Sequence, residues 1–496
     1  MFISRFEYKN NIWNLIAILL FSIVFATVLS SSSFLFDYYY PIDGTIFQII
    51  GKGWSEGKLP YVDLWDQKGP YIYFVNAVGY WLTGNKYGLL IVQIVFLCAS
   101  FTLLLHFWGK VFTKRVSFLL IIVLACHLAQ LAPGLNVIEL YELPFHILSF
   151  YLLWDWASKA KNQCQSHPAE NALLYGVLLG ICFLNRLTDA IGVCLGSFCV
   201  FIYLVNKKLW RNMWYNIGTF FVGFIAIVLP VFFYFYMNEA LEEMLFASIL
   251  FNFEYVNNTF REPPTIYAII STCLAYISSL GLFTISLILV FVDKKNVSFH
   301  LMWAFIAFVT FFYFINTFMY EHYAIIAIPY FVLMTFEFES LVKLLPKRSV
   351  AFYFAKVGGF SVAGILLLNG IYQSYQSLKY CEKDETEVTQ YYDPSVMDFL
   401  DEQKNELLCY NIHPSIYLYN DITPCCRFFS LQGWYACFSK TASSKIKESI
   451  EESNAKYILM RNANNDTLID EILKDKYEIY PMKGLSQQFV LYLKQN

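Results

Sequence analysis

Charged residues stand in an unusual pattern at the edges of the apolar runs of this sequence. The densest group lies in the stretch from Tyr38 to Pro70, among Gly, Pro and aromatic residues: Asp43, Asp63, Asp66 and Lys68. Similar residues recur at the ends of later apolar runs: Glu139, Glu142, Arg186, Asp189, Glu321 and His322. Charges at a membrane boundary are costly and tend to be functional. Carboxylates can act as general bases or hard metal ligands, and Lys and Arg can bind phosphate.

The composition indicates that a membrane positions these residues. Of the 496 residues, 57% are hydrophobic and 15% are charged, whereas a soluble domain is about half apolar and about a quarter charged. The net charge of -3 gives no indication of a nucleic-acid partner. A helix needs about 20 apolar residues to span a bilayer, and about eleven segments qualify. They are 12–36, 87–109, 116–132, 138–156, 171–186, 189–205, 213–237, 265–292, 298–318, 323–342 and 350–373.

The basic residues predict the orientation of these spans, because short cytoplasmic loops are enriched in Lys and Arg. The segment 71–82 is too short to span the bilayer without tilt, so we expect a helix that lies along the outer face or is partly re-entrant, within a first outer loop, 37–86. The N-terminus is then cytoplasmic. The apolar run that follows it exceeds the roughly 7–15 residues of a signal peptide, which favours an uncleaved span. The basic residues that share the cytoplasmic side are Arg5, Lys9, Lys110, Lys114, Arg115, Lys159, Lys161, Lys207, Lys208, Arg211, Lys294, Lys295, Lys343, Lys347 and Arg348.

The C-terminal segment differs from the rest of the chain and falls outside on this topology. It alternates strand-like runs ("ELLCYNI", "AKYILM", "QFVLYLK") with a polar helical run ("SSKIKESIEES"). We therefore predict an all-α polytopic membrane domain over 1–375 and a small extracytoplasmic α/β domain over 380–496. The segment carries an odd number of cysteines, so they cannot all pair, and the sequence assigns no disulfide.

The first outer loop resembles a known family signature. The stretch "PIDGTIFQIIGKGWSEGKLPYVDLWDQKGPYIYF" is similar to the first loop of bacterial glycosyltransferases of the C superfamily. These multi-span enzymes use polyprenyl-phosphate sugars and are related to protein mannosyltransferases and to the aminoarabinose transferase of lipid A. The matching positions are Asp43, Gly57 to Asp63, and Lys68 to Pro70. Many members carry a second acidic residue after the first, where this chain has Gly44.

Three later stretches extend the resemblance over most of the membrane part. "GLNVIELYELPF" places the family's Glu at Glu139, and "GVLLGICFLNRLTDAIG" places its Arg at Arg186. Leu187 and Thr188 replace the family's Pro and Asn, so that match is partial. "EHYAIIAIPY" resembles a His-Tyr…Pro element that opens a late span. The resemblance implies that His322 and Tyr323 contact the donor phosphate.

The chemistry of such a transfer suits these residue types. A polyprenyl phosphate leaves as a stable anion, so cations must balance its developing charge, and Lys68 and Arg186 are the candidates. A carboxylate must take the proton from the acceptor hydroxyl, and we assign Asp43 to this role. A single displacement predicts inversion at the anomeric carbon. Asp63, Asp66 and Glu139 are expected to organise the loop or to hold a divalent cation such as Mg or Mn.

Each candidate also has a structural alternative. Asp43 can cap a helix, and Asp63 and Asp66 can cap turns. Lys68 can extend its charge to the interface. The acidic residues Glu139 and Glu142 can favour a helix start, Arg186 can pair with Asp189, and His322 can be an ordinary interfacial residue.

We therefore expect an inverting glycosyltransferase in the bacterial inner membrane. Its expected donor is a polyprenyl-phosphate sugar, and its acceptor an envelope glycolipid, polysaccharide or protein on the outer face. A transporter or flippase for lipid-linked saccharides would carry mid-span charges and pseudo-symmetric halves. A polysaccharide polymerase would place its main catalytic loop late in the chain.

Overall fold

The structure is a computed structural model that describes residues 12–36, 41–258, 265–315, 320–347, 349–391, 399, 406–453, 455–461, 467–485 and 487–495. Arg5, Lys9 and Arg348, which the predicted orientation uses, lie outside these ranges. The chain divides into two compact units. Unit 1 comprises Met1–Leu29, Gln93–Val231 and Pro263–Ser377, and unit 2 comprises Ser30–Val92, Phe232–Glu262 and Leu378–Asn496.

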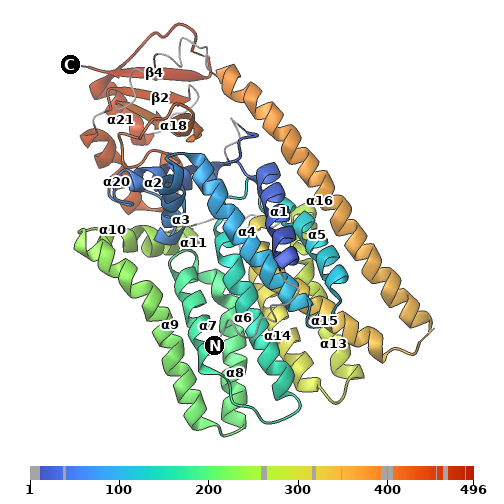
Figure 1. Cartoon of the computed structure of the whole chain (residues 1–496). Coiled ribbons are helices and arrows are strands. Elements are labelled where there is room, and N and C mark those ends of the chain that lie inside the picture. Colours follow the sequence, from blue (N-terminus) through green and yellow to red (C-terminus); the bar gives the residue numbers. More distant parts are fainter. Residues whose placement is uncertain are drawn as a thin grey trace. The chain divides into compact units, whose positions relative to one another are not determined.

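Long helices form nearly all of unit 1 (Figure 1), and each predicted span contains one or two of them. Backbone groups in a membrane must be satisfied within the segment, and a helix does this for an apolar run. The helices are α1 (Ile12–Leu29), α4 (Lys86–Trp108), α5 (Lys114–Leu131), α6 (Ile138–Ala160), α7 (Ala169–Phe183), α8 (Ile191–Asn206), α9 (Trp210–Met237), α12 (Ile266–Ala275), α13 (Ile277–Val292), α14 (Val297–Ile315), α15 (Ile328–Leu344) and α16 (Val350–Tyr391).

Eight helical segments of the described chain are long and apolar enough to cross a membrane, and a bent pair makes up to nine. The pair, Ile269–Ala275 and Ile277–Val292, bends by 73°. The predicted number was about eleven. Two predicted spans account for the difference. α7 has only 15 residues, and α6 contains polar residues such as Glu139, Glu142 and His146 in its first half.

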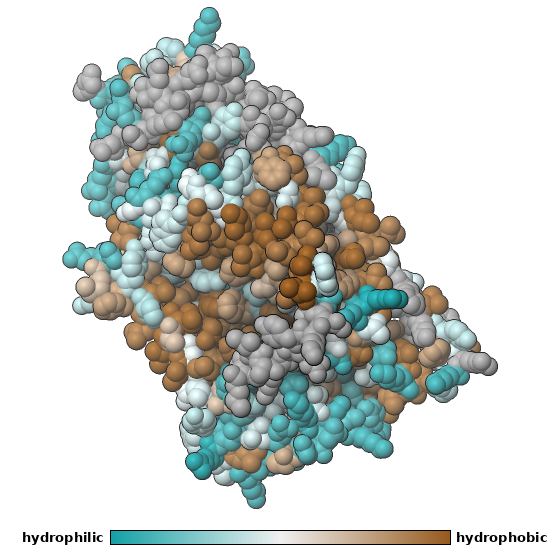
Figure 2. Space-filling model, viewed as in Figure 1, coloured by the Kyte–Doolittle hydropathy of each residue, from teal (hydrophilic) through white to brown (hydrophobic). Residues whose placement is uncertain are grey.

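Apolar side chains cover much of the visible surface of the long helices (Figure 2), as expected for helices in contact with lipid. Trp214 and Phe221 on α9 are 67% and 55% exposed, and Phe291 on α13 is 67% exposed. These features confirm an all-α polytopic membrane protein.

Glycines bring α7 and α9 into close contact within unit 1. A Cβ added at Gly176 would lie 1.9 Å from the carbonyl oxygen of Phe220, and one at Gly223 would lie 2.1 Å from that of Leu173. Small residues at such crossings allow two helix backbones to pack closely in a membrane. The sequence therefore specifies this contact through residues that have no side chain.

Unit 2 begins with a helical pair in the first outer loop. Helices α2 (Ile42–Ser55) and α3 (Pro70–Thr83) pack against each other, and α3 is the helix expected over 71–82. Asp43 lies in the first turn of α2, where an acidic residue favours the helix dipole. Its predicted capping alternative does not apply, because the N-cap residue is Pro41. The later loop of this unit contains the short helices α10 (Leu241–Leu245) and α11 (Phe251–Asn258).

The C-terminal segment forms the predicted small α/β fold (Figure 1). Strands β1 (Leu407–Tyr410), β2 (Tyr457–Arg461), β3 (Tyr477–Ile479) and β4 (Phe489–Lys494) form one sheet in the order β1-β2-β4-β3. β1 pairs with β2 in parallel, and β4 runs antiparallel to both β2 and β3. The helices here are α18 (Ser415–Tyr419), α19 (Gln432–Phe438), α20 (Lys440–Glu452) and α21 (Thr467–Lys476). The three predicted strands and the predicted helix are confirmed.

Candidate functional site

The first outer loop and the C-terminal segment meet at Asp66. The Asp66 side chain is buried, and its two oxygens accept hydrogen bonds from Tyr73 (2.6 Å) and Tyr435 (2.7 Å). Burial raises the pKa of Asp66 above its usual value of 3.8, against the opposing charge of Lys68 and the two tyrosine hydrogen bonds. Tyr435 lies 369 positions along the chain from Asp66. The carboxylate therefore joins two segments that no local sequence pattern connects.

Asp43 and Lys68 both lie near this carboxyl group. The charge of Asp43 acts to raise the pKa of Asp66, and the charge of Lys68 acts to lower it. Tyrosine hydroxyls hold both backbone polar groups of Lys68. Its N–H donates to Tyr73 (3.2 Å), and its carbonyl oxygen accepts from Tyr61 (2.9 Å). The structure thus brings three predicted residues, Asp43, Asp66 and Lys68, into one neighbourhood.

Asp63 lies apart from these three side chains. It is exposed, and its carboxylate accepts a hydrogen bond of 2.6 Å from the backbone N–H of Leu59. The Asp63 backbone N–H in turn donates to the carbonyl of Leu59 at 2.9 Å. This local pattern is that of a residue which organises a turn.

Aromatic packing and ion pairs reinforce the same contact within unit 2. Trp65 is fully buried, with its ring 4.8 Å from that of Phe428 and 4.7 Å from that of Tyr435. Glu243 in the later loop pairs with Arg427 and with Lys445, the latter at 2.5 Å. Burial acts to raise the pKa of Glu243, but the two cations outweigh burial and lower that pKa below its usual value. Three separated stretches of sequence therefore form one folded body.

A second polar cluster lies within unit 1 around Arg186, between α7 and α8. Its Nη2 lies 2.6 Å from Glu139 and 2.6 Å from Asp189, and its Nε donates to Asp189 at 2.8 Å. The Cζ atom lies 3.4 Å from the ring centroid of Tyr323. The Arg186 side chain is 18% exposed, while Glu139 and Asp189 are buried. One cation is thus held in a fixed orientation by two carboxylates and one aromatic face.

Each contact of Arg186 comes from the end of an element. Glu139 lies in the first turn of α6, and Asp189 lies in the 3-10 turn Leu187–Ala190 that precedes α8. Tyr323 lies in the 3-10 turn Glu321–Ala327 that opens α15. The His322 ring of this turn packs edge to face against the Tyr323 ring, with ring centroids 4.8 Å apart. The structure brings together the predicted residues Glu139, Arg186, His322 and Tyr323, and the suggested pairing of Arg186 with Asp189 is present.

Next to this cluster lies a buried group in which sequence reasoning named Glu142 but missed His146 and Cys182. Asn185 donates a hydrogen bond of 2.8 Å to Glu142, whose other oxygen lies 3.6 Å from both Cys182 and His146. Among the described residues, this is the group of three side chains that can hold a metal ion, and Asp43, Asp63 and Asp66 form no such group. The spacing of Glu142 and His146, four residues apart on a helix, was the available signal.

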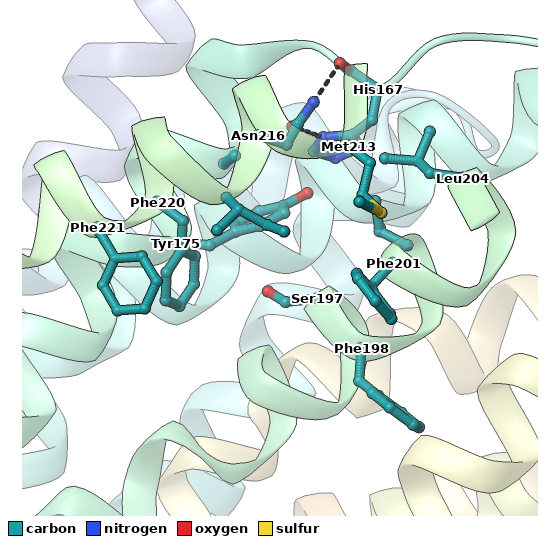
Figure 3. Close-up of a pocket in the computed structure, with 13 residues that line it drawn as sticks. His167, Tyr175, Ser197, Phe198, Phe201, Leu204, Met213, Asn216, Phe220 and Phe221 are labelled. Atoms are coloured by element: carbon teal, nitrogen blue, oxygen red, sulfur yellow. Dashed lines mark hydrogen bonds between the residues drawn. The ribbon is translucent and has the colours of Figure 1, made fainter. Parts of the chain in front are cut away.

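Unit 1 also contains an apolar pocket of about 250 Å³ between α7, α8 and α9 (Figure 3). Phe198, Phe201, Phe220 and Phe221 line it, together with Leu204 and Met213. His167 is fixed at its edge, where Nδ1 lies 2.6 Å from Asn216. Among the described residues, three polar atoms of the pocket have no hydrogen-bond partner: His167 Nε2, Tyr175 Oη and Ser197 Oγ. Such a lining suits an apolar chain with a polar end.

Comparisons with solved structures identify the fold. ArnT from Cupriavidus metallidurans bound to undecaprenyl phosphate is similar, with a TM-score of 0.57, 12% identity and 98% of each chain covered. ArnT of the same organism in the apo state has a TM-score of 0.60 at 11% identity, also with 98% of each chain covered. The oligosaccharyltransferase AglB from Archaeoglobus fulgidus, with an inhibitory peptide and a dolichol-phosphate, has a TM-score of 0.42 and 11% identity, over 92% of this chain and 70% of that chain. The likeness to ArnT at 11–12% identity is one of fold.

The fold of the chain is therefore similar to that of ArnT over nearly the whole length of both chains. No curated protein matches the sequence. The family model described as "Putative competence-induced protein Ccs4 N-terminal domain" matches residues 4–349, which is well over half of the chain. The chain belongs to this competence-induced Ccs4 N-terminal domain family.

Proposed function

We propose that this protein is an inverting glycosyltransferase of the bacterial inner membrane. It moves a sugar from a polyprenyl-phosphate donor to an envelope glycolipid, polysaccharide or protein acceptor on the outer face. The N-terminus is cytoplasmic and the C-terminal α/β segment extracytoplasmic in this proposal. The observation that carries it is the Arg186 cluster, in which the guanidinium of a partly exposed side chain is pre-oriented by Glu139, Asp189 and Tyr323.

The Arg186 cluster suits a phosphate that gains charge as the sugar leaves. A guanidinium binds phosphate oxygens with fixed geometry, and a fixed cation needs no reorganisation at the moment of reaction. Nε and Nη2 are used by the two carboxylates, whereas no described residue forms a hydrogen bond or ion pair with Nη1. In the proposal, the Nη1 edge of the Arg186 guanidinium faces the donor phosphate. Lys68, His322 and Tyr323 are further phosphate contacts.

Asp43 is the proposed general base. It is partly buried in the first turn of α2 and is followed by Gly44, which is buried and adds no side chain. Its carboxylate takes the acceptor hydroxyl proton as the oxygen attacks the anomeric carbon. The bond from that carbon to the phosphate oxygen breaks in the same step, and polyprenyl phosphate leaves as an anion. Because one displacement occurs, the configuration inverts.

Donor turnover by the purified full-length protein in detergent tests this proposal. A panel of radiolabelled polyprenyl-phosphate sugars is offered with acceptors extracted from membranes, and the wild type is compared with Asp43→Asn. We expect label transfer that falls by about 100-fold or more in the variant, because a positioned general base contributes about 10²–10⁴-fold. Asp475→Asn makes the same chemical change at an exposed position of α21 and should leave transfer unchanged.

Two outcomes contradict the proposal in different ways. Transfer that survives in Asp43→Asn removes Asp43 from the role of base and leaves the transferase function standing. Absence of transfer with every donor, together with movement of lipid-linked sugar across proteoliposomes, overturns the transferase in favour of a flippase.

A further inference from the structure

Three metal-ligand atoms of different chemistry converge in the interior of unit 1. Glu142 Oε2 lies 3.6 Å from His146 Nε2 and 3.6 Å from Cys182 Sγ, and the last two atoms are 3.9 Å apart. Glu142 and Cys182 are completely buried, and His146 is 1% exposed. The three side chains therefore converge on one point in the interior of the unit.

The separation of His146 from Glu142 suits two ligands of one ion better than a hydrogen bond, while the thiol of Cys182 donates to Glu142 Oε2 at 3.6 Å. A hydrogen bond between nitrogen and oxygen spans about 2.7–3.2 Å, so 3.6 Å between His146 Nε2 and Glu142 Oε2 is too long. With bonds of about 2.0 Å to nitrogen and oxygen and about 2.3 Å to sulfur, a tetrahedral zinc ion places its ligand atoms roughly 3.3–3.6 Å apart. The observed triangle needs only a small contraction to reach these values.

The elements hold the three side chains rigidly. Glu142 and His146 are four residues apart on α6, so they share one face of the helix. Cys182 lies in the last turn of α7, which packs against α6. Asn185 donates to the second oxygen of Glu142 at 2.8 Å and so orients the carboxylate. Hydrogen bonds of this kind from a neighbouring residue commonly fix a metal ligand in place.

The charge around the three side chains is a separate indication of a cation. The buried carboxylates Glu139, Glu142 and Asp189 lie near a single arginine, Arg186. Among the described residues no lysine pairs with these carboxylates. Oε1 of Glu139 pairs with Arg186, whereas Oε2 of Glu139 and Oδ2 of Asp189 receive no hydrogen bond. Unpaired buried charge is strongly unfavourable, so a divalent cation at Glu142 would offset the excess.

We propose that Glu142, His146 and Cys182 bind a zinc ion. A thiolate and an imidazole favour zinc over Mg²⁺ or Mn²⁺, which prefer oxygen ligands. Three protein ligands leave a fourth position for water. The ion joins α6 to the last turn of α7. Because α7 ends at Phe183, three residues before Arg186, the ion stabilises the turn that presents Arg186. The inference is independent of the sugar-transfer proposal, because it concerns metal content and stability.

Metal content of the purified full-length protein tests the site. The protein is produced in medium with added zinc, washed free of loose metal, and measured by elemental mass spectrometry. We expect about one zinc ion per chain in the wild type and loss of that ion in Cys182→Ser and in His146→Gln. Cys199→Ser, which alters a partly buried thiol on α8 outside the group, should keep the ion. Equal zinc in the wild type and Cys182→Ser, or none in the wild type, overturns the proposal.

Cobalt substitution provides a readout that depends on the bonds themselves. Co²⁺ bound through a thiolate absorbs in the near ultraviolet by charge transfer from sulfur, and this band should appear in the wild type and in Cys199→Ser. It should be absent in Cys182→Ser while that variant still elutes as a folded, monodisperse protein. A band of equal strength in Cys182→Ser would overturn the assignment of this thiolate. A Cys182→Ser variant that retains the wild-type unfolding temperature and its response to a chelator would overturn the stabilising role.

Discussion

The guanidinium of Arg186 lies over the face of Tyr323, with Cζ 3.4 Å from the ring centroid. The same group pairs with Glu139 and Asp189. The sequence alone allows two roles for Arg186: contact with a phosphate, or an ion pair with Asp189 one turn away. The structure contains the pair and adds two further contacts from distant elements. Since Arg186 remains 18% exposed, pairing with Asp189 does not exclude contact with a ligand.

Arg186→Lys tests the need for a planar cation. Lysine keeps one positive charge near Glu139 and Asp189, but it cannot form two parallel hydrogen bonds or stack on Tyr323. We expect sugar transfer to fall by about 100-fold, a typical effect of removing one oriented donor at a developing charge. The unfolding temperature should change little, because the charge is kept. Arg186→Gln should lower it clearly, since loss of one partner leaves buried charges unpaired, at about 3–5 kcal/mol. Wild-type transfer in Arg186→Lys would contradict the proposed role.

Tyr435→Phe tests the contact between Asp66 and the C-terminal segment. The change removes one hydroxyl and its 2.7 Å hydrogen bond to Asp66. We expect a loss of about 1.5–3 kcal/mol in the free energy of unfolding, the range for a hydrogen bond to a charged group. A double-mutant cycle with Asp66→Asn, followed by thermal unfolding in detergent, should give a coupling of about 0.5–3 kcal/mol. Strictly additive effects would show that the two side chains do not interact.

The ion pairs of Glu243 with Arg427 and Lys445 should weaken at acidic pH, which lowers the stability of the protein. Burial opposes its ionisation, but Lys445 and Arg427 outweigh burial and lower its pKa in the folded protein below the usual 4.5. The folded state then binds this proton less tightly than the unfolded chain. The stabilisation is present above the usual pKa and disappears as the pH falls through the lowered value. The difference in unfolding temperature between the wild type and Glu243→Gln should therefore shrink on acidification. A difference in unfolding temperature that does not change with pH would contradict the lowered pKa of Glu243.

Gly51→Ala tests the close packing of α2 on α3. A Cβ at Gly51 would lie 2.4 Å from the Cβ of Asn76 and 2.8 Å from the backbone nitrogen of Ala77. Since the backbone of α3 must move, we expect a loss of about 1–3 kcal/mol in stability. Gly218→Ala in α9 is the matched control, because its Cβ would meet no atom within 4 Å. That substitution should be neutral or stabilise the helix by about 0.5–1 kcal/mol. Equal behaviour of the two variants would contradict the packing.

The sequence alone determined where the helices of the predicted spans lie and where three strands of the C-terminal segment lie. Each expected span contains a helix, and the runs "ELLCYNI", "AKYILM" and "QFVLYLK" contain β1, β2 and β4. These features depend on local periodicity, apolar content and backbone satisfaction, which are properties of consecutive residues. β3 was not predicted, because its three residues are too few to show an alternating pattern.

Only the tertiary structure decided which side chains meet. It grouped the first outer loop and 232–262 with the C-terminal segment in one compact unit, whose last part begins at Leu378. The helix α16 runs across this point. The bond between Asp66 and Tyr435 and the group of Glu142, His146 and Cys182 likewise join separate elements. Such contacts depend on how helices and loops pack over long sequence separations. Local spacing places two residues on the same face of one helix, but it does not specify which other helix that face will meet.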